Sequence, residues 1–105
     1  MIYVIRAIGS QYIKIGKAKN PLGRMKTLQT GTPYKLVLAS CADWPDSSEK
    51  RLHRVLVDLY VIGEWYLLTD KTQSLIDHMQ SGLDLRSWLA KQANNKRLER
   101  VLRLA

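Results

Sequence analysis

The sequence predicts an α+β domain, in which a small antiparallel β-sheet is flanked by helices and a helical extension follows at the C-terminus. Three observations lead to this fold class. Two β-rich segments joined by a tight turn open the chain, helical segments with apolar stripes alternate with further strands, and a basic amphipathic segment follows Gly82. The 105 residues suffice for one hydrophobic core, so we expect a domain at residues 1–82 and a basic helical extension at residues 83–105.

The first two predicted strands form a hairpin. Ile2–Ile8 is rich in β-branched and aromatic residues, Gly9-Ser10 is a turn signal, and Tyr12–Ala18 is the returning strand. Strands joined this tightly must be antiparallel. Side chains alternate between the two faces of a strand, so Lys14 and Gly16 are expected to share one face.

A helix and a third strand follow the hairpin. Asn20 has the side chain of an N-cap, and Pro21 suits the first helical position, where its missing N–H has no intrahelical partner in any case. Gly31 is placed to end this helix. Lys35–Ala42 reads as the third strand, because it is again rich in β-branched and apolar residues.

The second half of the domain is predicted to be mainly helical. Asp46 and Glu49 have the spacing of a capping box, and the apolar stripe behind them predicts a helix that Gly63 stops. The segment 64–69 is then a short strand or extended segment, and a further helix ends at Gly82. We expect the helices of the domain to cover one side of the sheet.

The C-terminal extension is predicted to contain two helices. Asp84 is the expected cap of the first, Asn94-Asn95 is the expected break, and the residues after it form a basic amphipathic helix. Its apolar residues could pack on the domain, while its basic residues could hold nucleic acid or a partner. The basic residues in question are Lys96, Arg97, Arg100 and Arg103.

The charge distribution points to an anionic partner. The net charge is +8, and the first 42 residues contain seven basic residues and no acidic one. Those seven are Arg6, Lys14, Lys17, Lys19, Arg24, Lys26 and Lys35. Nucleic-acid phosphate is the first candidate for the partner and anionic lipid the second, and a surface that serves only solubility is the alternative.

Few residues are suited to catalysis. The lone Cys41 excludes an internal disulfide, and carboxylates that could converge on two metal ions are missing. Glu49 and His53 stand four residues apart on one helix face, which leaves open a site with one carboxylate and one metal ion. The alternatives are a capping role for Glu49 and a single structural hydrogen bond for His53. Glu64 is expected to be exposed beside a packed Trp65.

Several motifs in order resemble the GIY-YIG nuclease superfamily. They are "IYVI", "YIKIG", "KNPLGRMKTLQTG" and "EKRLHRVLVDLYVIGEWY", which together cover about Ile2 to Leu68. The chain looks most similar to a small phage-type subgroup that is often described as a DNA-binding domain. The first motif tyrosine falls on Tyr3, but Lys14 stands where the second motif tyrosine is found. Tyr12, two residues earlier on the same strand face, could substitute for it sterically.

The resemblance implies a metal-dependent endonuclease that hydrolyses phosphodiester bonds in DNA. Glu49 would hold Mg²⁺ or Mn²⁺, Arg24 and Lys14 would stabilise the phosphate, and Tyr3 or His53 would be the general base. A free phenol titrates near ~10, so Tyr3 would need a lowered pKa, with the nearby cations as the expected cause. Lys17, Lys19, Lys26 and Lys35 are the expected nucleic-acid contacts.

Two other functions remain open at this stage. The chain could be a DNA-binding module with weak or no activity, or a protein that binds partners or a second copy through its C-terminal helices. RNA is an alternative to DNA as the polymer. We expect a cytoplasmic location, because the residues show no signal peptide, no apolar stretch approaching the ~20 residues of a membrane span, and a single cysteine.

Overall fold

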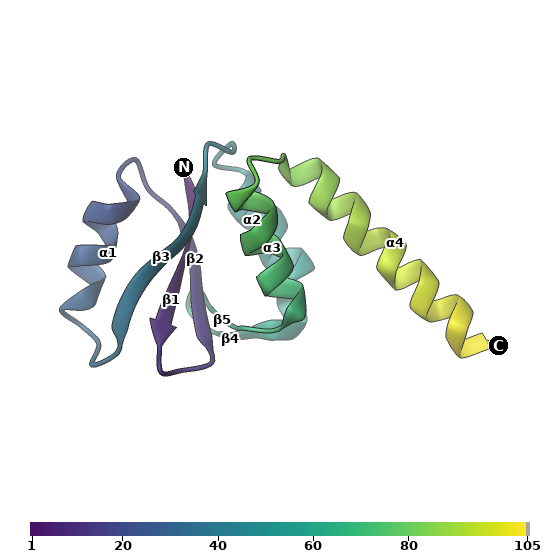
Figure 1. The fold of residues 1–105 in the computed structure, drawn as a ribbon, viewed down its shortest axis with the longest axis horizontal. Coiled ribbons are helices and arrows are strands. Elements are labelled where there is room, and N and C mark those ends of the chain that lie inside the picture. Colours follow the sequence, from purple (N-terminus) through teal and green to yellow (C-terminus); the bar gives the residue numbers. More distant parts are fainter. Residues whose placement is uncertain (105) are drawn as a thin grey trace.

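The computed structural model describes residues 1–104 and has an α+β fold, as predicted. Five antiparallel strands form one sheet in the order β3-β1-β2-β5-β4 (Figure 1). The strands are β1 (Ile2–Ile8), β2 (Tyr12–Lys17), β3 (Lys35–Ala42), β4 (Tyr60–Ile62) and β5 (Trp65–Leu67). The helices are α1 (Pro21–Gln29), α2 (Ser48–Val55), α3 (Asp70–Gln80) and α4 (Leu85–Leu104), with a 3₁₀ turn at Val57–Leu59.

The sheet is covered on both faces, so the prediction of helices on one side was wrong. Helices α2 and α3 and the start of α4 pack over the face that carries Ile2 and Val4. Helix α1 covers the opposite face, which carries Tyr3 and Ile5 (Figure 1). The physical reason is the composition of β1, which is apolar on both faces and pairs with β2 on one edge and β3 on the other. A strand of this kind needs cover on each side.

The segment after α2 differs from the prediction of one long helix and one extended segment. Helix α2 ends at Val55, and β4 and β5 form a hairpin around Gly63, whose φ of 57° lies in the left-handed region. Glycine adopts that conformation without the steric penalty that a Cβ brings. Tyr60–Ile62 is a short run of aromatic and β-branched residues, which explains its preference for a strand over a further helical turn.

Helix α4 is continuous, so the predicted break at Asn94-Asn95 was wrong. Asparagine costs a helix at most about 0.7 kcal/mol relative to alanine, and neither glycine nor proline is present to end it. The predicted cap is confirmed, because the backbone N–H of Ser87 donates to Oδ1 of Asp84 at 3.0 Å. Trp88 is fully buried in the core, but beyond it the helix projects away from the domain (Figure 1).

The projecting part of α4 leaves an apolar stripe uncovered. The alternative in which this helix packs on the domain is contradicted, because its large apolar side chains are more than half exposed. They are Leu98, Val101 and Leu102, at 59%, 57% and 65%.

Among residues 1–104, none of the helices combines the length and the apolar composition needed to cross a lipid bilayer.

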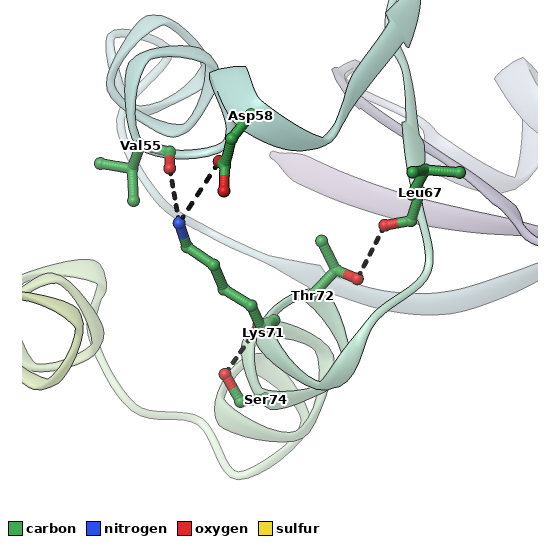
Figure 2. A network of polar contacts seen from close by, with 6 residues as sticks. All are labelled: Val55, Asp58, Leu67, Lys71, Thr72 and Ser74. Carbon is green, nitrogen blue, oxygen red and sulfur yellow. Dashed lines mark hydrogen bonds and ion pairs between the residues drawn. The ribbon is translucent and has the colours of Figure 1, made fainter. Parts of the chain in front are cut away.

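A polar network joins α3 to the end of α2 and to β5 (Figure 2). The Nζ atom of Lys71 donates to the carbonyl of Val55 at 2.8 Å and lies 3.6 Å from Oδ1 of Asp58. The hydroxyl of Thr72 donates to the carbonyl of Leu67 at 3.0 Å. These contacts fix α2, the helix that carries Glu49, relative to the sheet.

Candidate active site

The candidate site lies where β2 continues beyond Trp65, the first residue of its partner strand β5. Residues Tyr12–Lys14 pair with Leu67–Trp65, and the backbone N–H of Ile15 donates to the carbonyl of Glu64 at 3.1 Å. The β2–β5 pairing covers neither Gly16 nor the end of β2. The sheet is therefore open beside Gly16, and side chains from the hairpin turn can approach β1 there.

Tyr3 is seated directly over Gly16, its cross-strand partner. The Tyr3 side chain is buried, with only 1% of the residue exposed. A Cβ built on Gly16 would lie 2.6 Å from Cζ of Tyr3, nearer still to its hydroxyl, and 3.1 Å from Oε2 of Glu64. The phenol and the Glu64 carboxylate thus converge on the space that only glycine leaves free.

Glu64 is part of this site and is not merely exposed beside Trp65, as the sequence suggested. Its carboxylate is 37% exposed and forms an ion pair with Lys14, with 3.3 Å between Nζ and Oε2. The Lys14 ammonium also lies 5.4 Å from the ring centre of Trp65. Although the first 42 residues contain no acid, one of their cations is therefore partly neutralised by a residue fifty positions later.

The pKa of Tyr3 is raised above its ordinary value of 10.0, so Arg24 lowers it as expected but does not outweigh the opposing causes in the protein alone. Burial of the phenol is the largest cause, and the negative charges of Glu64 and Glu49 act in the same direction. The guanidinium of Arg24 opposes them. The charges of Arg24, Glu49 and Glu64 therefore all act on the Tyr3 hydroxyl.

Glu49 is free of the capping role that its spacing suggested. Helix α2 has Ser47 as its N-cap, with no side-chain hydrogen bond at the cap, so the Asp46 capping box was a wrong prediction. The Oε2 atom of Glu49 is buried and has no hydrogen-bond partner among residues 1–104. A buried carboxylate oxygen without a donor is energetically costly, and a bound cation would relieve that cost.

His53 stands one turn after Glu49, in a cluster of aromatic rings. Its Nδ1 hydrogen-bonds the hydroxyl of Tyr66, and its ring centre lies 6.3 Å from that of Tyr60. Burial raises the pKa of Tyr66, and the charge of Glu49 adds to the effect. The charge of Glu49 therefore acts on two buried phenols, Tyr3 and Tyr66. The single hydrogen bond considered for His53 is present.

Comparison with known families places this geometry in context. The model of the T5orf172 domain matches residues 1–81. The chain belongs to the T5orf172 domain family. No curated protein and no solved structure matches the chain.

The cations predicted to contact nucleic acid lie on two separate parts of the molecule, of which only the first is within the T5orf172 domain. One group is exposed on the end of β2, the loop before α1, α1 itself and the start of β3, and the other is exposed on α4. The first group consists of Lys17, Lys19, Arg24, Lys26 and Lys35, and the second of Lys96, Arg97, Arg100 and Arg103. Helices α1 and α4 lie at opposite ends of the molecule, so the fold does not join these groups into one patch (Figure 1).

At the candidate site, sequence reasoning missed the contributions of Glu64 and Tyr66. Both belong to "GEWY", the last motif of the resemblance, which was the available signal. Their positions depend on the pairing of β2 with β5, which no local pattern in the sequence defines. Gly16 was placed correctly on the same strand face as Lys14, but its close approach to Tyr3 follows only from the β1–β2 register.

Proposed function

We propose that this protein is a divalent-metal-dependent endonuclease that hydrolyses phosphodiester bonds in DNA. The observation that carries the proposal is the buried, unpartnered oxygen of Glu49, whose charge, like that of Arg24, influences the pKa of the Tyr3 hydroxyl. The ordered motifs that resemble the GIY-YIG superfamily, and the phage-associated T5orf172 family, support it. RNA is the alternative polymer that the same phosphate contacts admit.

Glu49 fits the role of holding Mg²⁺ or Mn²⁺. Magnesium usually binds through one or two carboxylates, with water and substrate phosphate completing its octahedral shell. Residues 1–104 contain no cluster of three or more His, Cys, Asp and Glu arranged to hold an ion, so the site would rely on Glu49, with Glu64 as the second carboxylate nearby. When bound, the ion supplies charge stabilisation for the leaving oxygen.

Arg24 and Lys14 are proposed to bind the scissile phosphate. The guanidinium of Arg24 is exposed on α1, beside the Tyr3 hydroxyl, and keeps its charge at every physiological pH. It can donate two parallel hydrogen bonds to phosphate oxygens. Lys14 is 11% exposed and already paired with Glu64, so its ammonium would act from the floor of the site and balance that carboxylate.

Tyr3 is proposed to orient the attacking water and to accept its proton. In the protein alone this phenol keeps its proton at neutral pH, because burial and two carboxylates raise its pKa. To act as a base, Tyr3 must first lose its own proton to solvent. Neutralising the charge of Glu49 removes one of the causes that oppose this loss, while Arg24 favours the phenolate against burial and the charge of Glu64. His53, which hydrogen-bonds Tyr66 through Nδ1, is the alternative base.

A cleavage assay on paired variants tests the proposal. Plasmid and single-stranded DNA are incubated with Mg²⁺ or Mn²⁺ and either the wild type, Glu49→Gln or Asp46→Asn. The control removes one negative charge at an exposed position just ahead of α2, without touching the site. We expect cleavage by the wild type and by Asp46→Asn, and none by Glu49→Gln at unchanged DNA binding. Equal cleavage by all three proteins would refute the role of Glu49.

A DNA-binding module without hydrolytic activity is the second candidate. It is favoured by the raised pKa of Tyr3, which keeps the phenol protonated, and by the ion pair with Glu64, which occupies the Lys14 ammonium. On this alternative, the wild type and Glu49→Gln bind DNA equally and neither cuts it in the presence of either metal ion. That result would leave the basic surface as the whole function.

A further inference from the structure

An uncharged hollow of about 410 Å³ opens next to the candidate site. It is formed by the end of β1, the start of β2, the loop after α1 and the β4–β5 hairpin. Its lining residues include Tyr12, Tyr34 and Trp65, with Val61 and Ile62 from the hairpin. The volume falls within the range of small-ligand sites, and three of the residues are aromatic.

Two of the aromatic side chains present much of their surface to solvent. Tyr12 is 40% exposed and Tyr34 is 42% exposed. The backbone of Tyr34 is held in place, because its carbonyl accepts from Nε2 of Gln29 at 2.8 Å and its N–H donates to Oγ1 of Thr32 at 3.2 Å. The backbone that presents this ring is therefore anchored before any ligand arrives.

The hollow adjoins the residues proposed to bind the scissile phosphate. Tyr12 and Lys14 are two residues apart on one strand face, which separates them by roughly 6–7 Å. Trp65 lines the hollow, and its ring centre lies 5.4 Å from Nζ of Lys14. Lys35 is exposed immediately after Tyr34 in the chain. The apolar, aromatic hollow thus has two lysines in its neighbourhood, the exposed Lys35 and Lys14, whose charge Glu64 partly neutralises.

We infer that this hollow binds an unpaired nucleobase of single-stranded nucleic acid, next to the phosphate held at the site. The inference rests on the proposed function and names the form of its substrate. Bases stack on aromatic rings while cations follow the backbone, and this combination is typical of single-strand binding sites. A duplex keeps its bases stacked and paired, so it cannot offer one to the hollow without unstacking it.

Equilibrium binding to matched oligonucleotides tests the inference. A fluorescein-labelled strand of about 12 nucleotides, within the usual site size, is compared with its blunt duplex by anisotropy, in EDTA so that no cleavage occurs. Tyr34→Ala and Tyr12→Ala remove one ring each, Tyr34→Phe keeps the ring, and Leu22→Ala removes an exposed apolar side chain of α1 outside the hollow.

We expect each ring deletion to weaken single-strand binding by roughly tenfold or more, with duplex binding unchanged. Tyr34→Phe and Leu22→Ala should bind like the wild type. An equal loss of affinity for the single strand and the duplex, or no loss of affinity for either, would overturn the inference. So would dissociation of a dimer by Tyr34→Ala at unchanged nucleic-acid affinity, because the hollow would then hold a second copy.

The cleavage assay separates this inference from the proposed function. If Glu49-dependent cleavage occurs but the ring deletions leave the strand preference unchanged, the base site is wrong and the endonuclease stands. If the wild type binds neither the single strand nor the duplex, both the base site and the endonuclease function are wrong.

Discussion

Replacing Gly16 with alanine is the substitution that most directly tests how Tyr3 is held. A Cβ at this position would lie 2.6 Å from Cζ of Tyr3, a distance that real Cβ contacts essentially never show. Because the Tyr3 ring is only 1% exposed, it cannot swing into solvent and must displace its neighbours. Overpacking of this kind costs roughly 1–3 kcal/mol. In a domain of this size that loss lowers Tm by about 5–20 °C.

Thermal unfolding of Gly16→Ala, followed by circular dichroism, measures this effect. Gly31→Ala is the matched control, because its Cβ would meet only the carbonyl of Leu28 at 3.7 Å, and we expect a change within about 0.5 kcal/mol. In the double variant with Tyr3→Leu, the two losses should be less than additive, because the smaller side chain relieves the clash. A Gly16→Ala protein as stable as the wild type, with full cleavage activity, would refute the described seat of Tyr3.

The remaining predictions concern charge, the phosphate contact, the last helix and pH. Glu64→Gln frees Lys14 from its ion pair, so the affinity for DNA in EDTA should be higher than that of the wild type. This affinity should also decrease more steeply with salt concentration, and a lower affinity would contradict the prediction. Arg24→Ala should abolish cleavage while weakening binding only slightly, since one phosphate contact among many contributes little affinity, and equal loss of both would refute the catalytic role. Truncation after Asn95 removes only side chains that are exposed among those described, so Tm should stay unchanged. The affinity for DNA at low salt should decrease, and an unchanged affinity would exclude α4 from DNA binding. Burial raises the pKa of Tyr66 above 10.0, so the unfolded chain loses its proton first and the free energy of unfolding should fall above about pH 10; Tyr66→Phe should flatten that fall in a denaturant titration across pH, and an unchanged slope would contradict the burial.

Local signals in the sequence predicted most of the fold. The hairpin of β1 and β2 followed from two β-rich runs around Gly9, and the start of α1 followed from Asn20, whose Oδ1 accepts from the Gly23 N–H at 3.1 Å. The cap of α4 at Asp84 was likewise predicted. These features depend on residues within a few positions of one another, which is why sequence patterns define them.

Features that depend on packing between distant segments were not predictable in this way. The helices on both faces follow from the placement of β1 inside the sheet, between β3 and β2. The pairing of Lys14 with Glu64 depends on the register of β2 against β5. Glu49 matched a local capping pattern, but α2 begins after Ser47, which leaves the Oε2 atom of Glu49 buried and unpaired.

The raised pKa of Tyr3 illustrates the same limit. At the level of sequence, the role of Tyr3 as a base required a lowered pKa, with Lys14, Arg24 and the metal ion as the agents. Burial, which no count of charges describes, is the larger effect, and two carboxylates from distant segments add to it. Whether a phenol can act as a base therefore depends on the folded environment and not on the local charge pattern.

The proposed function requires a divalent cation at Glu49, on the side of the Tyr3 hydroxyl. Anomalous diffraction from a crystal soaked in Mn²⁺ tests it most directly, with a Glu49→Gln crystal treated identically. The account predicts an anomalous peak at roughly 2.0–2.2 Å from a Glu49 carboxylate oxygen, on the side of the Tyr3 hydroxyl, that is absent from the variant. A wild-type crystal with no peak there, or with the Glu49 side chain turned back to cap α2, would contradict it.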